Sequence, residues 1–404
     1  MVTIPTQSVE GCMKDISEEL RAQWLTILRD VPVSINNLYG DPMIQWGDTV
    51  QKLESLARSG HTGPVGIIIK GVVTPDRARV LREFIDRGLQ VVVLVSISEL
   101  YPRFENVPMA HRYRNLAVLR EAGVSVIAYV RPMTPPYNTA PEVIDRIFTN
   151  LAANGAMHVV ASGFRGDDAI VRQMSPDEHV EWVLRVKQMN GEVFTRFLDH
   201  CTRLGMHLFT RTSCGVCAVL GRPDYNPYLY SPRLVRCSEV GCPNYLNGSC
   251  QPVTAPKPGS IELLRYLGYT VSLMGGDCTA RCQTTGENRL QCPSCCTTCW
   301  VLPVPAVYIE GQVRLGDLTF GRFLTGMLTR HRGCNDTGDK DVGRVTMPRF
   351  PEVEVTCLNS WWPMARWGET CFRCEYCILQ YYRTGQAGRE FGFPPASLLD
   401  RIGL

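Results

Sequence analysis

Short apolar runs alternate with amphipathic segments over the first half of the chain. Runs rich in valine and isoleucine lie at 65–71, 89–98, 124–132 and 156–164. Segments with the apolar spacing of helices lie around them, at 17–29, 49–58, 75–87, 111–122, 141–153 and 176–204. Strands that are almost wholly apolar are typical of a parallel sheet with both faces covered. The pattern therefore predicts repeated strand–helix units and an α/β fold.

The residues between these segments agree with the predicted elements. Thr74 and Pro75 are suited to the first turn of a helix, because threonine accepts from a free amide and proline fits the first helical position. Predicted helices end at four glycines, which readily adopt the left-handed conformation that turns the chain back: Gly88, Gly123, Gly155 and Gly205. With five or six such units, a full or partial TIM-like barrel is favoured over a doubly wound sheet.

The chain changes character after Gly205. Residues 211–232 are rich in turn residues and predict loops, 253–260 is typical of a linker, and 261–267 predicts a short helix. Only Cys12 and Cys201 precede residue 210, and all the other cysteines lie between Cys214 and Cys377. We therefore predict two domains, an α/β barrel-like domain at 1–210 and a cysteine-rich metal or iron–sulfur domain at 211–404.

Composition narrows the class of protein. The chain has 404 residues, of which 45% are hydrophobic and 20% charged, as in ordinary globular proteins, and a formal net charge of +3 predicts no strongly basic surface. No apolar run reaches the roughly 18 residues that span a bilayer, and the first residues lack the pattern of a secretory signal. We expect a cytoplasmic protein without a membrane partner, in which cysteines bind metal rather than form disulfides.

The later cysteines form three groups with the spacing of metal ligands. The first has enough thiolates for one four-ligand site: Cys214, Cys217, Cys237, Cys242 and Cys250. The second contains two short-spaced pairs: Cys278, Cys282, Cys292, Cys295, Cys296 and Cys299. The third has CxxCxxC spacing, which favours a [4Fe–4S] cluster with the fourth iron open or held by Cys334 or Cys357: Cys371, Cys374 and Cys377. Zinc is the alternative cofactor.

Polar residues gather where the predicted strands end. The carboxyl ends of the strands carry the ligand site in parallel barrels, so these residues are candidates for a functional rim. They are Asn37, Tyr39, Asp41, Lys70, Ser96, Ser98, Arg131, Ser162 and Arg165. The alternative role for the same side chains is to cap strands and to satisfy the backbone of loops.

Four segments of the first half resemble a known family. They are NNLYGDP at 36–42, GPVGIIIKG at 63–71, LVSIS at 94–98 and HRYRNLAVLREAGVSVIAYVRPMTP at 111–135. Together they resemble the radical S-adenosylmethionine superfamily, particularly its spore photoproduct lyase-like branch. The resemblance implies a TIM-like barrel that binds S-adenosylmethionine. The cofactor contacts that it implies come from Asn37, Tyr39, Asp41, Lys70, Ser96, Ser98 and Arg131.

The CxxxCxxC motif of that family is missing from its usual place. Cys12 stands alone there, with Ile16 and Glu19 where the other two cysteines would be. One hypothesis is that residues 353–382 complete the barrel as a circular permutation. The chain is then an iron–sulfur radical enzyme that takes electrons from a donor and acts on an unknown small-molecule or nucleic-acid substrate. The alternative is a catalytically silent barrel with zinc or iron–sulfur sites, which serves as a binding or scaffold protein, with nucleic acid as one candidate partner.

Overall fold

The computed structural model describes the chain in part. The described residues are 16–35, 40–164, 172–175, 189, 191–225, 237–250, 253, 255–266, 269–274, 306–310, 321, 323–331, 344–347 and 350–356.

Six parallel strands form the main sheet. They are β1 (Val33–Ile35), β2 (Pro64–Ile69), β3 (Gln90–Ile97), β4 (Ser125–Met133), β5 (His158–Gly163) and β6 (His207–Phe209). Their order in the sheet is their order in the chain, and every neighbouring pair is parallel. The predicted parallel α/β fold is therefore confirmed. Among the described residues β1 pairs with β2 alone and β6 with β5 alone, so closure of a barrel stays a prediction.

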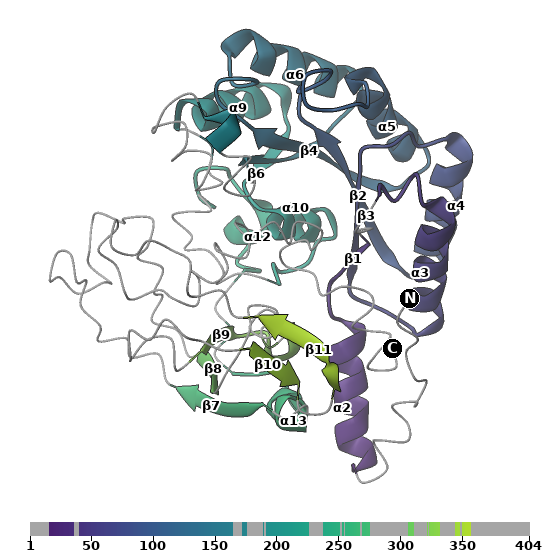
Figure 1. The fold of residues 1–404 in the computed structure, drawn as a ribbon, viewed down its shortest axis with the longest axis vertical. Helices are drawn as coiled ribbons and strands as arrows, with labels where there is room; N and C mark the ends of the chain where they lie inside the picture. Colours follow the sequence, from purple (N-terminus) through teal and green to yellow (C-terminus); the bar gives the residue numbers. More distant parts are fainter. Residues whose placement is uncertain are drawn as a thin grey trace, which may run out of the picture.

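Helices that connect the strands cover one face of this sheet (Figure 1). Right-handed crossovers between strands in sequential order place their helices on the same side. Leucines and phenylalanines of these helices share one core with alternate strand residues such as Val93 and Val130. The helices are α3 (Trp46–Arg58), α4 (Pro75–Asp86), α5 (Met109–Glu121), α6 (Pro141–Ala153) and α9 (Gly191–Leu204), and α2 (Glu18–Arg29) precedes β1.

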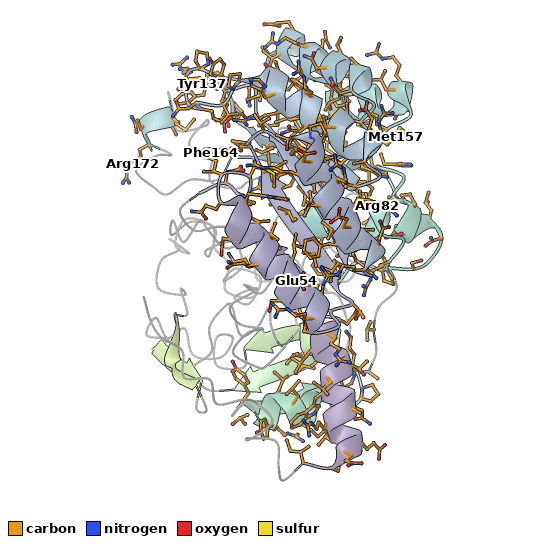
Figure 2. All side chains as sticks on the ribbon, turned by 90° about the vertical axis from the view of Figure 1, so that its right-hand side faces the viewer. Glu54, Arg82, Tyr137, Met157, Phe164 and Arg172 are labelled. Atoms are coloured by element: carbon orange, nitrogen blue, oxygen red, sulfur yellow. The ribbon has the colours of Figure 1, made fainter. Side chains whose placement is uncertain are left out.

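The ends of α4 show why these helices begin and end where they do. The Thr74 hydroxyl accepts from the Arg77 amide at 3.3 Å and Pro75 follows it, as predicted. Gly88, just beyond the helix, has a φ of 99° and lets the chain turn into β3. Figure 2 looks onto these helices from outside, where Glu54 of α3 and Arg82 of α4 lie on the solvent side. Arg87 bridges α4 to Glu54 at 2.7 Å.

A further helix, α10 (Thr212–Val219), lies on the opposite face of the sheet, as Figure 1 shows. The prediction of loops for 211–232 is wrong at these residues. Because α10 is buried on most of its surface, it has no polar face and gives no amphipathic period. It approaches the sheet so closely that a Cβ at Gly215 would lie 2.4 Å from Cγ2 of Val160. We call this side of the sheet the α10 face.

The direction of α10 is antiparallel to the strands. At its start, the Thr212 hydroxyl lies 2.7 Å from the Tyr129 hydroxyl, in the carboxyl half of β4. Just after its end, Arg222 bonds Asp30 at 2.6 Å and the Thr62 carbonyl at 3.0 Å, before β1 and β2. The helix therefore extends from the carboxyl edge to the amino edge of the sheet.

The later part of the chain packs beside α2. The Trp24 indole of α2 donates to the Gly259 carbonyl at 2.8 Å and contacts the Tyr266 ring, with 4.9 Å between centroids. β8 pairs antiparallel with β7 and parallel with β9, while β10 and β11 pair antiparallel. The elements are α12 (Pro243–Leu246), α13 (Ser260–Tyr266), β7 (Thr270–Met274), β8 (Ala306–Glu310), β9 (Leu328–His331), β10 (Arg344–Met347) and β11 (Phe350–Thr356).

The segment proposed to complete the barrel is described only at its start. Residues 353–356 belong to β11, whose partner among the described strands is β10. Residues 357–382 lie outside the described residues, so the circular permutation stays a prediction. No helix within the described ranges is long and apolar enough to cross a membrane.

Candidate functional site

A network of charged side chains occupies the carboxyl edge of β2 and β3. Glu105 lies 2.6 Å from the Lys70 ammonium and 2.7 Å from the guanidinium of Arg112, and it accepts a hydrogen bond from Ser98. Arg112 is fully buried and also donates to the Ser96 carbonyl at 3.1 Å. The structure thus brings together Lys70, Ser96 and Ser98 from the predicted rim.

Glu105 and Arg112 were not predicted as site residues, although they organise this network. Burial by itself raises the pKa of the Glu105 carboxyl, but Lys70, Ser98 and Arg112 outweigh burial and hold this pKa below its usual value. Glu105 is therefore an anion shared by two cations. The sequence signal that could have identified these two residues is an acidic residue in the loop after a predicted strand, followed by arginines on the next predicted helix.

Asp41 joins the loop after β1 to the end of β2. Its carboxylate accepts from the backbone amides of Lys70, of Gly71 at 3.0 Å and of Met43 at 2.8 Å. A Cβ at Gly71 would lie 2.8 Å from the carboxylate, so this contact requires glycine. These hydrogen bonds correspond to the alternative role considered for the rim residues, which is to satisfy the backbone of loops. Binding of a cofactor by Asp41 stays a prediction.

Arg131 lies beside the start of α10. Its guanidinium carbon lies 4.7 Å from the centroid of the Tyr129 ring, and it also bonds the Tyr129 hydroxyl. That hydroxyl contacts Thr212, the first residue of α10. Ser162 of β5 is buried, and its hydroxyl has no hydrogen-bond partner in the part of the chain that the structure describes. The carboxyl edge of β4 and β5 therefore carries a cation and an unsatisfied hydroxyl next to a helix start.

An aromatic cluster borders the same edge. Arg103 lies over two rings, 5.2 Å from the centroid of Phe104 and 4.5 Å from that of Tyr137. Tyr137 and Phe164 pack on Met174, and Figure 2 shows Tyr137 and Phe164 at one corner of the molecule. These rings therefore lie just beyond the polar residues of the predicted rim.

The first cysteine group comes together along one side of α10. Cys214 and Cys217 share one side of this short helix, because residues three apart neighbour each other on a helix surface. The Cys214 thiol donates to the Asp224 carboxylate at 3.3 Å, and the Asp224 amide donates to the Cys250 sulfur at 3.3 Å. Cys242 precedes α12, and its amide donates to the Cys237 carbonyl at 3.1 Å.

The groups that raise the pKa of each thiol show which cysteines lie close together. Burial is the largest cause that raises the pKa of Cys214, and Asp224, Cys237 and Cys242 raise it further. Burial together with Cys242, Asp224 and Cys250 raises the pKa of Cys237 to about 12. Burial, Asp224 and Cys242 likewise raise the pKa of Cys250 to about 11. Each thiolate would repel the next, so these thiols are neutral unless a cation lies among them.

Among the other four cysteines, Cys217 interacts with Cys250 alone. Its pKa is raised by burial first and then by Asp224 and Cys250, while a backbone hydrogen bond from Tyr225 opposes the shift. We therefore define the thiol cluster as Cys214, Cys237, Cys242 and Cys250, with Asp224 at its border.

The donor chemistry of the thiol cluster suits a soft metal, since zinc and iron–sulfur clusters prefer thiolates. Among the described residues, no three His, Cys, Asp or Glu side chains are already arranged as metal ligands. The Cys214 thiol instead bonds Asp224. Metal binding therefore requires the thiols to lose their protons and to turn towards a common centre.

Several predicted site residues lie outside the described residues. They are Asn37, Tyr39, Arg165, Cys278, Cys282, Cys292, Cys295, Cys296, Cys299, Cys371, Cys374 and Cys377. Their roles as cofactor or metal ligands stay predictions.

Comparisons with known proteins identify no family. No protein-family model matches this chain, and no curated protein matches it.

Proposed function

We propose that this protein is a metalloprotein, and that the thiolates of Cys214, Cys237, Cys242 and Cys250 bind one metal ion. The observation that carries the proposal is that Cys214 and Cys250 both bond Asp224, while Cys237 and Cys242 lie close enough to raise the pKa of Cys214. Gathering thiols in this way is unfavourable without a cation, which would lower their pKa values and deprotonate them. Zinc fits four thiolates in a closed tetrahedral site, and an iron–sulfur cluster is the alternative.

A metal at this position would have a structural role. It would tie Cys214 of α10, which lies on the sheet, to the segment 237–250. Four protein ligands leave no open position on zinc, so such a site stabilises a fold rather than activating water. Asp224, which bonds both Cys214 and Cys250, would lie beside the metal and orient two of its ligands.

Metal analysis of single variants tests this proposal. We expect Cys214→Ser, Cys237→Ser and Cys242→Ser each to lower the metal content of anaerobically purified protein by about one equivalent, since a structural site needs all four ligands. The variants should also unfold at lower temperature, because metal affinity contributes to the free energy of folding. Elemental analysis by mass spectrometry gives the metal, and visible absorption separates zinc from iron–sulfur.

Two other cysteines are matched controls. Cys201 of α9 is buried in the apolar core, away from the thiol cluster, and Cys217 lies outside the set of four. Cys201→Ser and Cys217→Ser should keep the full metal content. Wild-type metal content in Cys214→Ser and Cys242→Ser would contradict the proposal, and so would its loss in Cys201→Ser.

A radical S-adenosylmethionine enzyme is a second candidate. The observation that favours it is the six-stranded parallel sheet in chain order, with polar residues at its carboxyl edge. A [4Fe–4S] cluster on Cys371, Cys374 and Cys377 would supply the radical chemistry of that cofactor. Ser96 and Arg131 would bind S-adenosylmethionine at the edge. Asp41 and Lys70 carry other contacts, so Asp41 contributes only if it leaves the backbone amides after β2, and Lys70 only if it leaves Glu105.

The same purified protein separates this enzyme from the silent scaffold. After anaerobic reconstitution with iron and sulfide, an electron donor and S-adenosylmethionine should yield 5′-deoxyadenosine. Cys374→Ser should abolish this product, while Cys214→Ser removes only the structural metal. A filled cluster without product would leave the scaffold protein, with a nucleic acid or another partner to be identified.

A further inference from the structure

The first turn of α10 has backbone amides without acceptors. The first bond of the helix runs from the Gly215 amide to the Arg211 carbonyl at 3.2 Å. The amides of Thr212, Ser213 and Cys214 precede it, and the N-cap residue Arg211 provides no side-chain cap. Within the described part of the chain these three amides have no acceptor, although Ser213 is buried. A buried helix start without acceptors is unfavourable unless water or a ligand supplies them.

A second observation comes from β5. The Ser162 side chain is 7% exposed, and its hydroxyl has no hydrogen-bond partner among the described residues. Val160 faces Gly215 of α10, so Ser162, two residues on, points to the same side of the sheet. It lies about 7 Å beyond Val160 along the strand, while the start of α10 lies about 5 Å before Gly215. The hydroxyl is therefore level with the first turn of α10.

The neighbouring side chains make this position electropositive. Arg131 is on β4 next to Ser162, and it bonds the Tyr129 hydroxyl that contacts Thr212. Arg211 is the N-cap itself. A helix start carries a partial positive charge, which adds to that of the guanidinium groups. The Asp224 carboxylate, which accepts from the Cys214 thiol of the same turn at 3.3 Å, is an acidic group nearby.

We propose that the start of α10, with Ser162 and Arg131, binds the phosphate group of a small-molecule ligand. Amides at a helix start, a hydroxyl and a guanidinium are the donors that bind phosphate oxygens in proteins. The ligand would accept from the amides of Thr212 and Ser213 and from the Ser162 hydroxyl. The thiol cluster borders this site, because Cys214 belongs to the same turn of α10, but the phosphate donors include no thiol.

Calorimetric titration of the full-length, metal-loaded protein with inorganic phosphate tests this site. Parallel titrations at the same ionic strength use adenosine 5′-monophosphate, adenosine and acetate. We expect phosphate and the monophosphate to bind, and adenosine and acetate not to. Ser162→Ala should weaken phosphate binding about tenfold, because it removes a hydrogen bond to a charged group, and Arg131→Gln should weaken it further.

Ser34 supplies a matched control. Its hydroxyl is also buried and has no partner among the residues that the structure describes, but it lies on β1, while α10 begins beside β4 and β5. Ser34→Ala should bind phosphate as the wild-type protein does, and circular dichroism shows that each variant is folded. The proposal is overturned if the wild-type protein binds no phosphate, or if Ser162→Ala binds it with unchanged affinity. Tighter binding of acetate than of phosphate would overturn it too.

Discussion

Glu105 is the residue on which the carboxyl edge depends most. Its carboxylate neutralises Arg112, which has no exposed surface, and it also pairs with the half-exposed Lys70. A buried guanidinium without its anion keeps the full cost of desolvation, whereas an exposed one is solvated by water. The ion pair of Glu105 with Arg112 therefore contributes more to stability than its ion pair with Lys70.

Replacing Glu105 tests this inequality. We expect Glu105→Gln to lower the free energy of unfolding by about 3 kcal/mol, because Arg112 stays buried beside a neutral amide. Urea denaturation at neutral pH measures the change. Asp76→Asn is the control, since Asp76 and Arg79 are largely exposed, and its loss should stay within about 1 kcal/mol. Equal losses in both variants would mean that Arg112 does not depend on Glu105.

At the scale of elements, α10 is held to the sheet by shape. Gly215 leaves room for Val160, and Ile127 and Phe209 lie close to the same position. Alanine would favour the helix by about 1 kcal/mol in open surroundings. Here its methyl group would enter the stiff, β-branched Val160 side chain, so overpacking outweighs helix propensity.

We therefore expect Gly215→Ala to destabilise the protein by about 1 to 3 kcal/mol. Adding Val160→Ala to the Gly215→Ala variant should recover part of the lost stability, because it removes the methyl group that the new Cβ would meet. Gly47 of α3 has no atom within 4 Å of a built Cβ, and Gly47→Ala should be neutral or stabilising. Denaturation of the wild-type protein, of Gly215→Ala, of Val160→Ala and of the double variant gives the coupling, and additive effects would show that α10 and β5 do not touch at this position.

At the scale of the whole molecule, one junction joins the sheet, α10 and the later chain. Asp30 bonds Arg222, which follows α10, at 2.6 Å and lies 3.6 Å from Lys257, which precedes α13. His61 is buried beside this junction, and one of its ring nitrogens has no hydrogen-bond partner within the described ranges. Burial lowers the pKa of His61 to about 4, although Asp30 acts in the opposite direction.

This lowered pKa predicts how stability depends on pH. The unfolded histidine takes up its proton near the usual value of 6.5, while the folded one stays neutral down to about 4. Between these values the unfolded chain binds more protons, so stability falls as pH falls. We expect a loss of about 2 kcal/mol from His61 between pH 7 and pH 5, measured by denaturation at each pH.

Two variants isolate His61 from the other histidines. His61→Gln should flatten the loss between pH 7 and pH 5, whereas His111→Gln, at an exposed position of α5, should not. His158 has a pKa lowered to about 4 by burial and His207, so some dependence remains. An unchanged slope in His61→Gln would place the acid sensitivity elsewhere.

The sequence by itself determined the parallel α/β half. Apolar runs such as 89–98, the Thr74–Pro75 start and glycines such as Gly88 act locally, because strand burial and helix ends depend on neighbours in the chain. The same local rules placed Lys70, Ser96, Ser98 and Arg131 at strand ends. They also brought together the cysteines of the first group as candidate metal ligands, although α10 itself was expected to be a loop.

Only the tertiary structure decided what these residues contact. A helix that is buried on nearly all sides, such as α10, has no amphipathic pattern in its sequence. Its place on the sheet depends on the contact of Gly215 with Val160, which lies 55 residues earlier in the chain. Likewise Glu105 meets Arg112 and Lys70 through the folded edge. Such pairings depend on shape and desolvation between distant segments, which no local pattern records.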